Sequence, residues 1–138
     1  MRKVIIILFS LLVLSACSNQ QNKVSVVEAM ESEGLNITES NVPSPMGIEL
    51  DGIKPITYKL DNDEMVLVYD FATADERELS HKLFQEHQLF LSSYGPIVYQ
   101  TSQSLILYYS NVNSTTSTFK LSETNAGEKI QKAIERME

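Results

Sequence analysis

Acidic side chains are the first place to look for chemistry in this 138-residue chain. Asp61, Asp63 and Glu64 form its densest acidic cluster, and carboxylates at this spacing could offer oxygen ligands to calcium. The glycine and the remaining ligand positions of an EF-hand loop are missing, however. An Asp-Asn-Asp sequence between two apolar runs is typical of a hairpin turn. We therefore expect a turn here and no metal site.

Two histidines and Asp70 are the remaining candidates for acid–base chemistry. His81 and His87 are six residues apart in a predicted helix, which places them about 240° apart around its axis, so they cannot share a metal ion. His87 falls on the apolar stripe and should be half-buried, whereas His81 should be solvated. Asp70 with His87 could serve a hydrolase or a metal enzyme. Because the common hydrolase, zinc and nucleotide-binding motifs are absent from the sequence, we expect no catalytic residues, no cofactor and no enzymatic activity.

Most of the tyrosines fall in segments that are predicted to be strands. Core and rim positions explain them without any ligand. Alternatively, Tyr99, Tyr108 and Tyr109 on a shared sheet surface would offer flat apolar faces with hydroxyl groups to a glycan or another small ligand. The sequence leaves both interpretations open.

The start of the chain has the pattern of an export signal. Arg2 and Lys3 precede an apolar run from Val4 to Leu14. The basic pair holds such a leader at the cytoplasmic face, and a run of about eleven apolar residues is too short to span a bilayer permanently. We expect residues 1 to 16 to be cleaved and not to belong to the fold.

The leader ends in Leu14-Ser15-Ala16-Cys17, which resembles the lipobox of bacterial lipoproteins. The resemblance is confined to this leader, and it implies cleavage between Ala16 and Cys17 with a diacylglyceryl group on the Cys17 thiol. Two acyl chains anchor a protein stably, since each buried methylene contributes about 0.8 kcal/mol. We expect the lipid bilayer to hold the protein through acylated Cys17 on the extracytoplasmic side of the cell membrane. Ser18 resembles residues that do not retain lipoproteins in the inner membrane, so the outer membrane is the expected location in a two-membrane envelope.

Charge and cysteine content narrow the class of partner. Without the two basic residues of the leader, the formal charge falls from −7 to −9. An acidic surface repels phosphates, so we expect no nucleic acid partner. Cys17 is the only cysteine, which excludes an internal disulfide.

The rest of the chain divides into a tether and one domain. Residues 17 to 23 contain the expected lipidated cysteine and six polar residues, which have no apolar surface to bury. Six residues reach about 20 Å at most, so the domain should stay near the membrane. Residues 24 to 138 are enough for a single compact domain.

Hydrophobic periodicity within that domain predicts an α+β fold. Capping boxes at Ser25 and Thr73 and a cap at Asn125 mark three helix starts. The predicted helices cover 26–33, 74–91 and the C-terminal stripe Ile130, Ala133, Ile134 and Met137, and the predicted strands cover 56–60, 65–71, 97–100 and 105–109. Residues 36 to 47 should form a loop. We expect a short N-terminal helix followed by a β-β-α-β-β-α core, with about four antiparallel strands and the helices packed on one face.

Two functions fit this organisation. The first is a non-enzymatic accessory or protein-interaction module, anchored to the membrane and bound to an envelope protein. The alternative is an anchored small-ligand or glycan-binding module that uses the tyrosine-rich sheet face.

Overall fold

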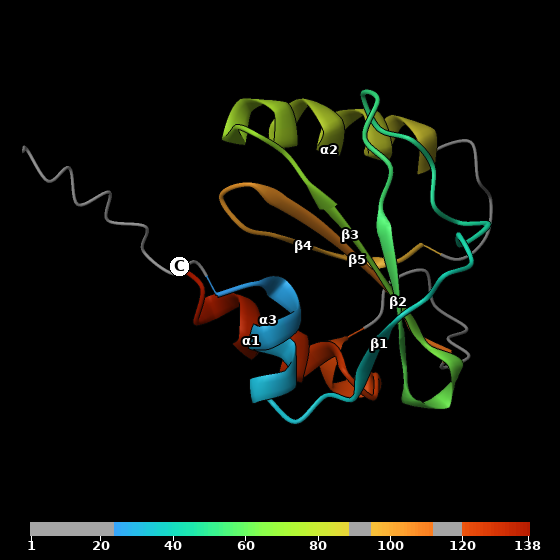
Figure 1. The fold of residues 1–138 in the computed structure, drawn as a ribbon, viewed down its shortest axis with the longest axis vertical. Helices are drawn as coiled ribbons and strands as arrows, with labels where there is room; N and C mark the ends of the chain where they lie inside the picture. The colour runs from blue at the N-terminus through green and yellow to red at the C-terminus, as the bar shows by residue number, and fades with distance from the viewer. Residues whose placement is uncertain (1–23, 89–94, 112–119) are drawn as a thin grey trace, which may run out of the picture.

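The structure is a computed structural model that describes residues 24–88, 95–111 and 120–138 (Figure 1). The expected leader, lipobox and tether lie outside the described residues. In chain order the elements are α1 (Val26–Ser32), β1 (Ile37–Glu39), β2 (Ile56–Leu60), η1 (Asp61–Asp63), β3 (Met65–Asp70), α2 (Ala74–Gln88), β4 (Ile97–Gln100), β5 (Ser104–Tyr109), η2 (Leu121–Glu123) and α3 (Gly127–Glu135).

The sheet has five antiparallel strands in the order β1-β2-β3-β5-β4. The predicted α+β class and the antiparallel sheet are confirmed, and β3 occupies the centre as its apolar sequence indicated. The additional strand is β1, in the segment predicted to be a loop. It is three residues long and only Ile37 is buried, so no alternating pattern announced it.

The helices lie on both faces of the sheet, which corrects the expected single-face arrangement. Val66 and Val68 of β3 point toward α1 and α3, whereas Leu67 and Tyr69 point toward α2. Figure 1 shows α2 on one side of the sheet and the α1–α3 pair on the other. All six residues of β5 are buried as well. Since the two central strands are apolar on both faces, each face needs a covering layer.

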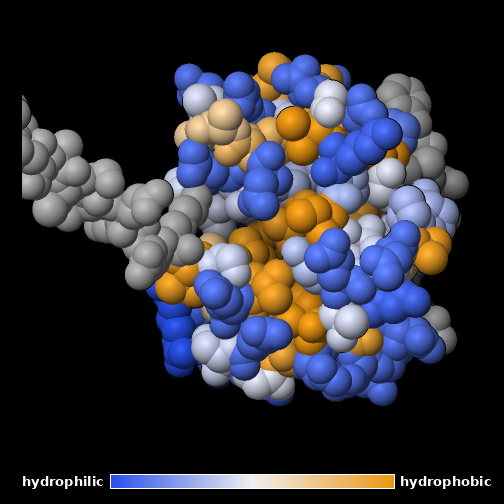
Figure 2. All heavy atoms as spheres, in the orientation of Figure 1, coloured by the Kyte–Doolittle hydropathy of each residue, from blue (hydrophilic) through white to orange (hydrophobic). Residues whose placement is uncertain are grey.

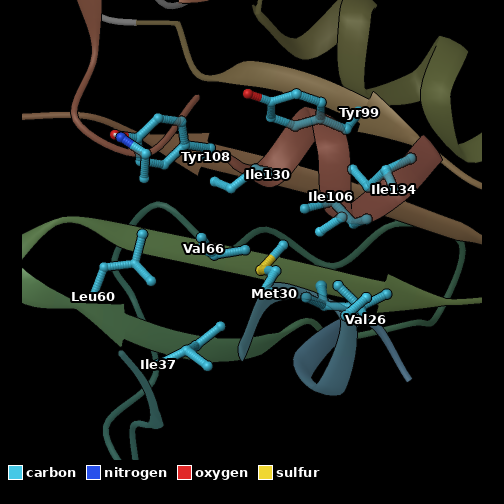
Figure 3. Close-up of a cluster of buried hydrophobic side chains, with 14 residues drawn as sticks. Val26, Met30, Ile37, Leu60, Val66, Tyr99, Ile106, Tyr108, Ile130 and Ile134 are labelled. Carbon is cyan, nitrogen blue, oxygen red and sulfur yellow. The ribbon is translucent and has the colours of Figure 1, made fainter. Parts of the chain in front are cut away.

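The α1–α3 face follows its sequence pattern closely. The predicted capping box at Ser25 is confirmed, because Ser25 Oγ accepts from Glu28 N at 3.1 Å and Glu28 Oε2 accepts from Ser25 N at 2.9 Å. The buried stripe of α3, Ile130, Ala133 and Ile134, meets Met30 and the sheet in one cluster (Figure 3).

The predicted cap of α3 at Asn125 is wrong, because the N-cap residue is Ala126, which makes no side-chain cap hydrogen bond. Thr124 Oγ1 accepts from Gly127 N, at 3.0 Å, just before the helix. The Asn125 amide instead donates to the buried carboxylate of Glu64. Because Glu64 is distant in the sequence, only the folded chain brings this acceptor close to Asn125.

Helix α2 departs from its predicted packing. Its capping box at Thr73 is confirmed, since Thr73 Oγ1 accepts from Glu76 N at 3.2 Å. The buried residues of α2 are Ser80 and Phe84, however, while Leu79 and Leu83, which form an apolar stripe with His87 at helical spacing, are 51 % and 39 % exposed. Leu79 and Leu83 are four residues apart, and so are Ser80 and Phe84, so helical periodicity fits either pair as the buried side. Hydrophobicity favours the leucine pair, but that pair faces outward.

Candidate functional site

The three tyrosines proposed as a ligand surface are core residues. Tyr99 and Tyr108 belong to the cluster under α1 and α3, and Tyr109 belongs to the cluster under α2. Each is at most 5 % exposed. Burial raises the pKa of Tyr108 and of Tyr109 to about 12. The Tyr99 hydroxyl donates to Gly127 O at 2.9 Å. These residues therefore do not form the shared contact surface that the sequence suggested.

Asp70 and His87 do not meet either. Asp70 ends β3 on the face that α1 covers, where it lines a pocket with Val26. His87 lies on α2, which covers the opposite face. His87 is exposed and His81 is partly buried, the reverse of what the helical stripe predicted. The geometry gives no acid–base pair between Asp70 and His87.

The acidic cluster separates into a turn and a buried residue. Asp61 to Asp63 form the 3-10 turn between β2 and β3, with φ of 64° at Asn62 and 60° at Asp63, so the predicted turn is confirmed. Such left-handed values are most accessible to Asn, Asp and Gly. Across residues 24–88, 95–111 and 120–138, no group of three or more His, Cys, Asp or Glu residues could hold a metal ion.

Glu64 is the member of the acidic cluster whose burial and hydrogen bonds the sequence did not indicate. It is 1 % exposed, and its oxygens accept from Tyr108 OH at 2.8 Å, Ser110 Oγ at 3.0 Å, Asn111 N at 3.4 Å and Asn125 Nδ2 at 3.0 Å. Four donors match the acceptor capacity of a carboxylate. Because the chain itself supplies these donors, we assign Glu64 a structural role that joins the start of β3 to the ends of β5 and to α3.

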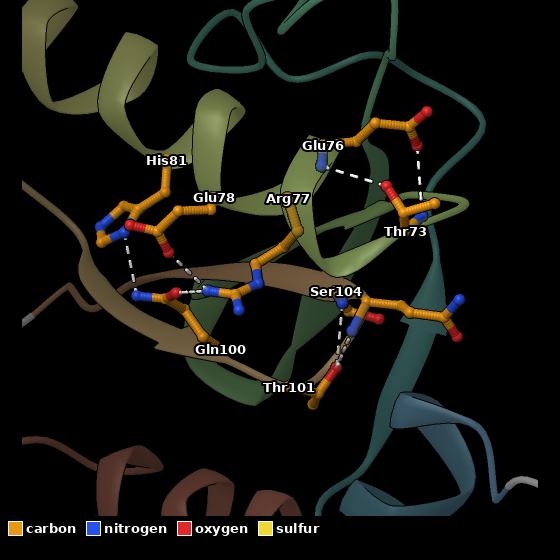
Figure 4. Close-up of polar contacts among 9 residues, drawn as sticks. Thr73, Glu76, Arg77, Glu78, His81, Gln100, Thr101 and Ser104 are labelled. Carbon is orange, nitrogen blue, oxygen red and sulfur yellow. Dashed lines mark hydrogen bonds and ion pairs between the residues drawn. The ribbon is translucent and has the colours of Figure 1, made fainter.

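A polar contact connects α2 to β4 (Figure 4). Arg77 can only donate, so it faces Gln100 Oε1, and the amide Nε2 then donates to His81 Nδ1 at 3.0 Å. Burial lowers the pKa of His81, the neighbouring Arg77 lowers it further, and Glu78 opposes the shift. A neutral imidazole therefore accepts from Gln100. The contact positions the helix on the sheet.

The first hollow of interest is the Asp70 pocket, a cavity of about 300 Å³ where the start of α1 meets β2, β3 and β5. Val26, Val68 and Met137 give it apolar walls, and Asp70 is the only charged side chain among the described residues that line it. Figure 2 shows hydrophobic side chains gathered between α2 and the α1–α3 pair, with hydrophilic side chains on either side.

The carboxylate of Asp70 accepts a hydrogen bond but has no ion-pair partner among the described residues. Asp70 Oδ1 accepts from Ser104 Oγ at 2.5 Å, across the β3–β5 pair that places the two residues opposite each other. In the part of the chain that the structure describes, no basic group forms an ion pair with Asp70. Burial first, and then the charges of Glu39 and Asp70, raise the pKa of Tyr58, another lining residue. The pocket therefore combines apolar walls with the negative charge of the Asp70 carboxylate.

The second hollow is the edge groove, with a volume of about 440 Å³. It is lined by the end of β1, the loop that follows, and the start of β2. Ile56 in its lining is 42 % exposed, and Val42 and Met46 in the adjoining loop are 70 % and 40 % exposed. Its charged lining residues are Glu39, Glu49 and Lys54.

Local contacts preform this groove. Ser40 N donates to Thr57 O at 2.8 Å and Ser44 N donates to Thr57 Oγ1 at 3.4 Å, so the loop is attached to β2. At Gly47 a Cβ atom would lie 3.0 Å from Pro55 Cγ and 3.2 Å from Ser44 O. Only glycine allows the loop to approach β2 this closely without displacement.

No family model, curated protein or solved structure matches this chain. Among the helices that the structure describes, none combines the length and the hydrophobicity needed to cross a bilayer. Functional inference therefore depends on the chain's own residues.

Proposed function

We propose that the chain is a lipoprotein, anchored through Cys17 on the extracytoplasmic side of the cell membrane, that acts as a non-enzymatic accessory protein. Its edge groove binds a partner protein of the cell envelope. The lipobox-like Leu14-Ser15-Ala16-Cys17 supports the anchor. The observation that carries the binding function is the set of exposed apolar side chains beside the groove, Val42, Met46 and Ile56.

Exposure and strand geometry favour a protein partner at this place. Apolar side chains that gather on a surface commonly mark an interaction site. The groove begins at β1, which is a terminal strand of the sheet, so the outer side of its backbone is turned away from β2. An extended segment can pair with such an edge while its side chains enter an adjacent groove.

Charge and tethering narrow the partner further. Glu39, Glu49 and Lys54 line the groove, Lys54 lies 4.0 Å from Glu49, and the chain without its leader has a formal charge of −9. Basic residues beside the apolar contact would therefore speed association. A tether of six residues keeps the start of the domain within about 20 Å of the membrane surface, so the partner should be a protein at or near the membrane.

Site-specific photocrosslinking in intact cells tests the groove. A photoreactive residue at position 46 should capture one reproducible partner, and one at the exposed Lys82 of α2 should not. Val42→Asp should abolish the capture, because it places a charge in the apolar contact. Leu79→Asp is the matched control, since it adds the same charge at an exposed apolar position outside the groove. Capture that survives Val42→Asp would refute the groove as the binding surface.

The anchor is tested separately by metabolic labelling with a palmitate analogue. Label should enter the wild-type protein and be lost from Cys17→Ser, which should also leave the membrane fraction. Equal labelling of the two proteins would refute the anchor and leave the groove result unaffected.

A further inference from the structure

We propose that the Asp70 pocket binds an organic ammonium group on a short apolar stem. This ligand chemistry is independent of the edge groove, and only its location at the membrane rests on the proposed anchor. The volume of about 300 Å³ is at the lower end of the range for small-ligand pockets, which fits a group of this size.

The apolar walls of the pocket favour a ligand with an apolar stem. Val26, Val27, Val68 and Met137 line it, and none of the described lining residues is basic. A polyhydroxylated sugar would lose hydrogen bonds to water against these side chains, whereas an alkyl stem gains from burial. An anion would be repelled by the carboxylate of Asp70.

The rim of the pocket favours a positively charged group on the ligand. Asp70 supplies the negative charge, and Ser104, which is 3 % exposed, donates to it and holds its orientation. Tyr58 also lines the pocket. An aromatic face attracts an ammonium group by its quadrupole, and this attraction adds to the ion pair with a carboxylate.

The position of the pocket in the chain places it close to the bilayer. Val24, the first residue described, lines the pocket and is 49 % exposed. Only six residues separate Val24 from Cys17, a reach of about 20 Å. Two sources of the ammonium group are therefore within reach, namely the headgroup of an aminophospholipid and a soluble amine at the membrane surface.

Binding of n-butylammonium to the mature lipidated protein tests the ligand chemistry. The protein is placed in phosphatidylglycerol vesicles, and binding is followed by NMR shifts of the lining residues. Shifts should saturate with n-butylammonium and should be absent with butyrate or n-pentanol. Asp70→Asn, which keeps an acceptor for Ser104, should weaken binding by about fivefold. Asp75→Asn, an exposed acid on α2, should leave it unchanged.

A second variant keeps the proposal falsifiable if Asp70→Asn unfolds. Val24→Lys brings an ammonium group of the chain itself to the pocket from an exposed position, so it should compete with n-butylammonium. Absence of saturable shifts in the wild type would overturn the proposal. Affinity that is unchanged in both folded variants, or equal affinity for butyrate, would overturn it as well.

Vesicles that contain phosphatidylethanolamine distinguish the two sources. Reduced binding of n-butylammonium in these vesicles would identify the lipid headgroup as the ligand. Equal binding in both kinds of vesicle would identify a soluble amine. Either result supports the ligand chemistry, and neither depends on capture of a partner at the edge groove.

Discussion

The two faces of the sheet are covered by different means. On the α1–α3 face, fourteen buried residues form one apolar cluster, to which both helices contribute. On the α2 face the cluster has eight buried residues among those described, and Phe84 is the only one of them from Ala74–Gln88 of the helix. The Arg77–Gln100–His81 contact supplements it, while Leu79 and Leu83 face outward. Within the described residues, apolar burial therefore holds α1 and α3, whereas one aromatic side chain and polar contacts hold α2.

The largest effect expected is a stability contrast between the two layers. Ile130 is fully buried, so Ile130→Ala should cost about 2 to 5 kcal/mol of unfolding free energy. Leu83→Ala, at 39 % exposure, should cost about 0.5 kcal/mol or less. Urea denaturation of the two variants measures both. A cost at Leu83 as large as that at Ile130 would break the comparison, because it would show that the outer side of α2 is buried.

A smaller effect is expected at the charged group beneath the α1–α3 layer. Glu64→Gln should cost about 1 to 3 kcal/mol, because an amide NH2 in the place of Oε2 would face the Tyr108 hydroxyl, which donates to that oxygen. Glu86→Gln, at an exposed position of α2, is the control. A double-mutant cycle with Tyr108→Phe should be non-additive, since the two residues share a hydrogen bond. An additive cycle would show that Glu64 does not connect the elements as described.

The smallest effect expected is a pH dependence of the α2 face. Burial lowers the pKa of His81, so on acidification the unfolded chain takes up the proton first, near the usual value of about 6.5. The stability that the neutral imidazole contributes is thus complete above that pH and is lost as the pH falls. His81→Gln should flatten the decline in thermal unfolding temperature below pH 6.5. His87→Gln, at an exposed position, should retain the wild-type slope.

Local sequence patterns predicted most of the helices and strands. They failed where the sequence allowed two arrangements and only tertiary packing decided between them. Both serine and threonine capping boxes were correct, because a cap involves residues only three apart. Strand β1 was missed, since three residues with one buried side chain produce no period. The inward stripe of α2 was misjudged because Arg77, Ser80 and His81 on that side are polar, and their partner Gln100, which bonds Arg77 and His81, comes from the distant strand β4.

The candidate sites, like the helices and strands, could be predicted from the sequence only in part. The sequence singled out Asp70, but its pocket combines Val24, Tyr58, Ser104 and Met137 from distant parts of the chain. The tyrosines were correctly assigned to strands, yet the alternation of β5 sends Tyr108 and Tyr109 to opposite faces.

By itself the sequence determined the helices, four of the strands, the α+β class, and the lipobox-like address on which the proposed anchor depends. These features arise from side chains that interact within a few positions, or from motifs read linearly. The tertiary structure alone decided which helix covers which face, where Glu64 finds its four donors, and which residues surround Asp70. Those outcomes depend on partners 34 to 61 positions away, whose proximity only the folded sheet creates.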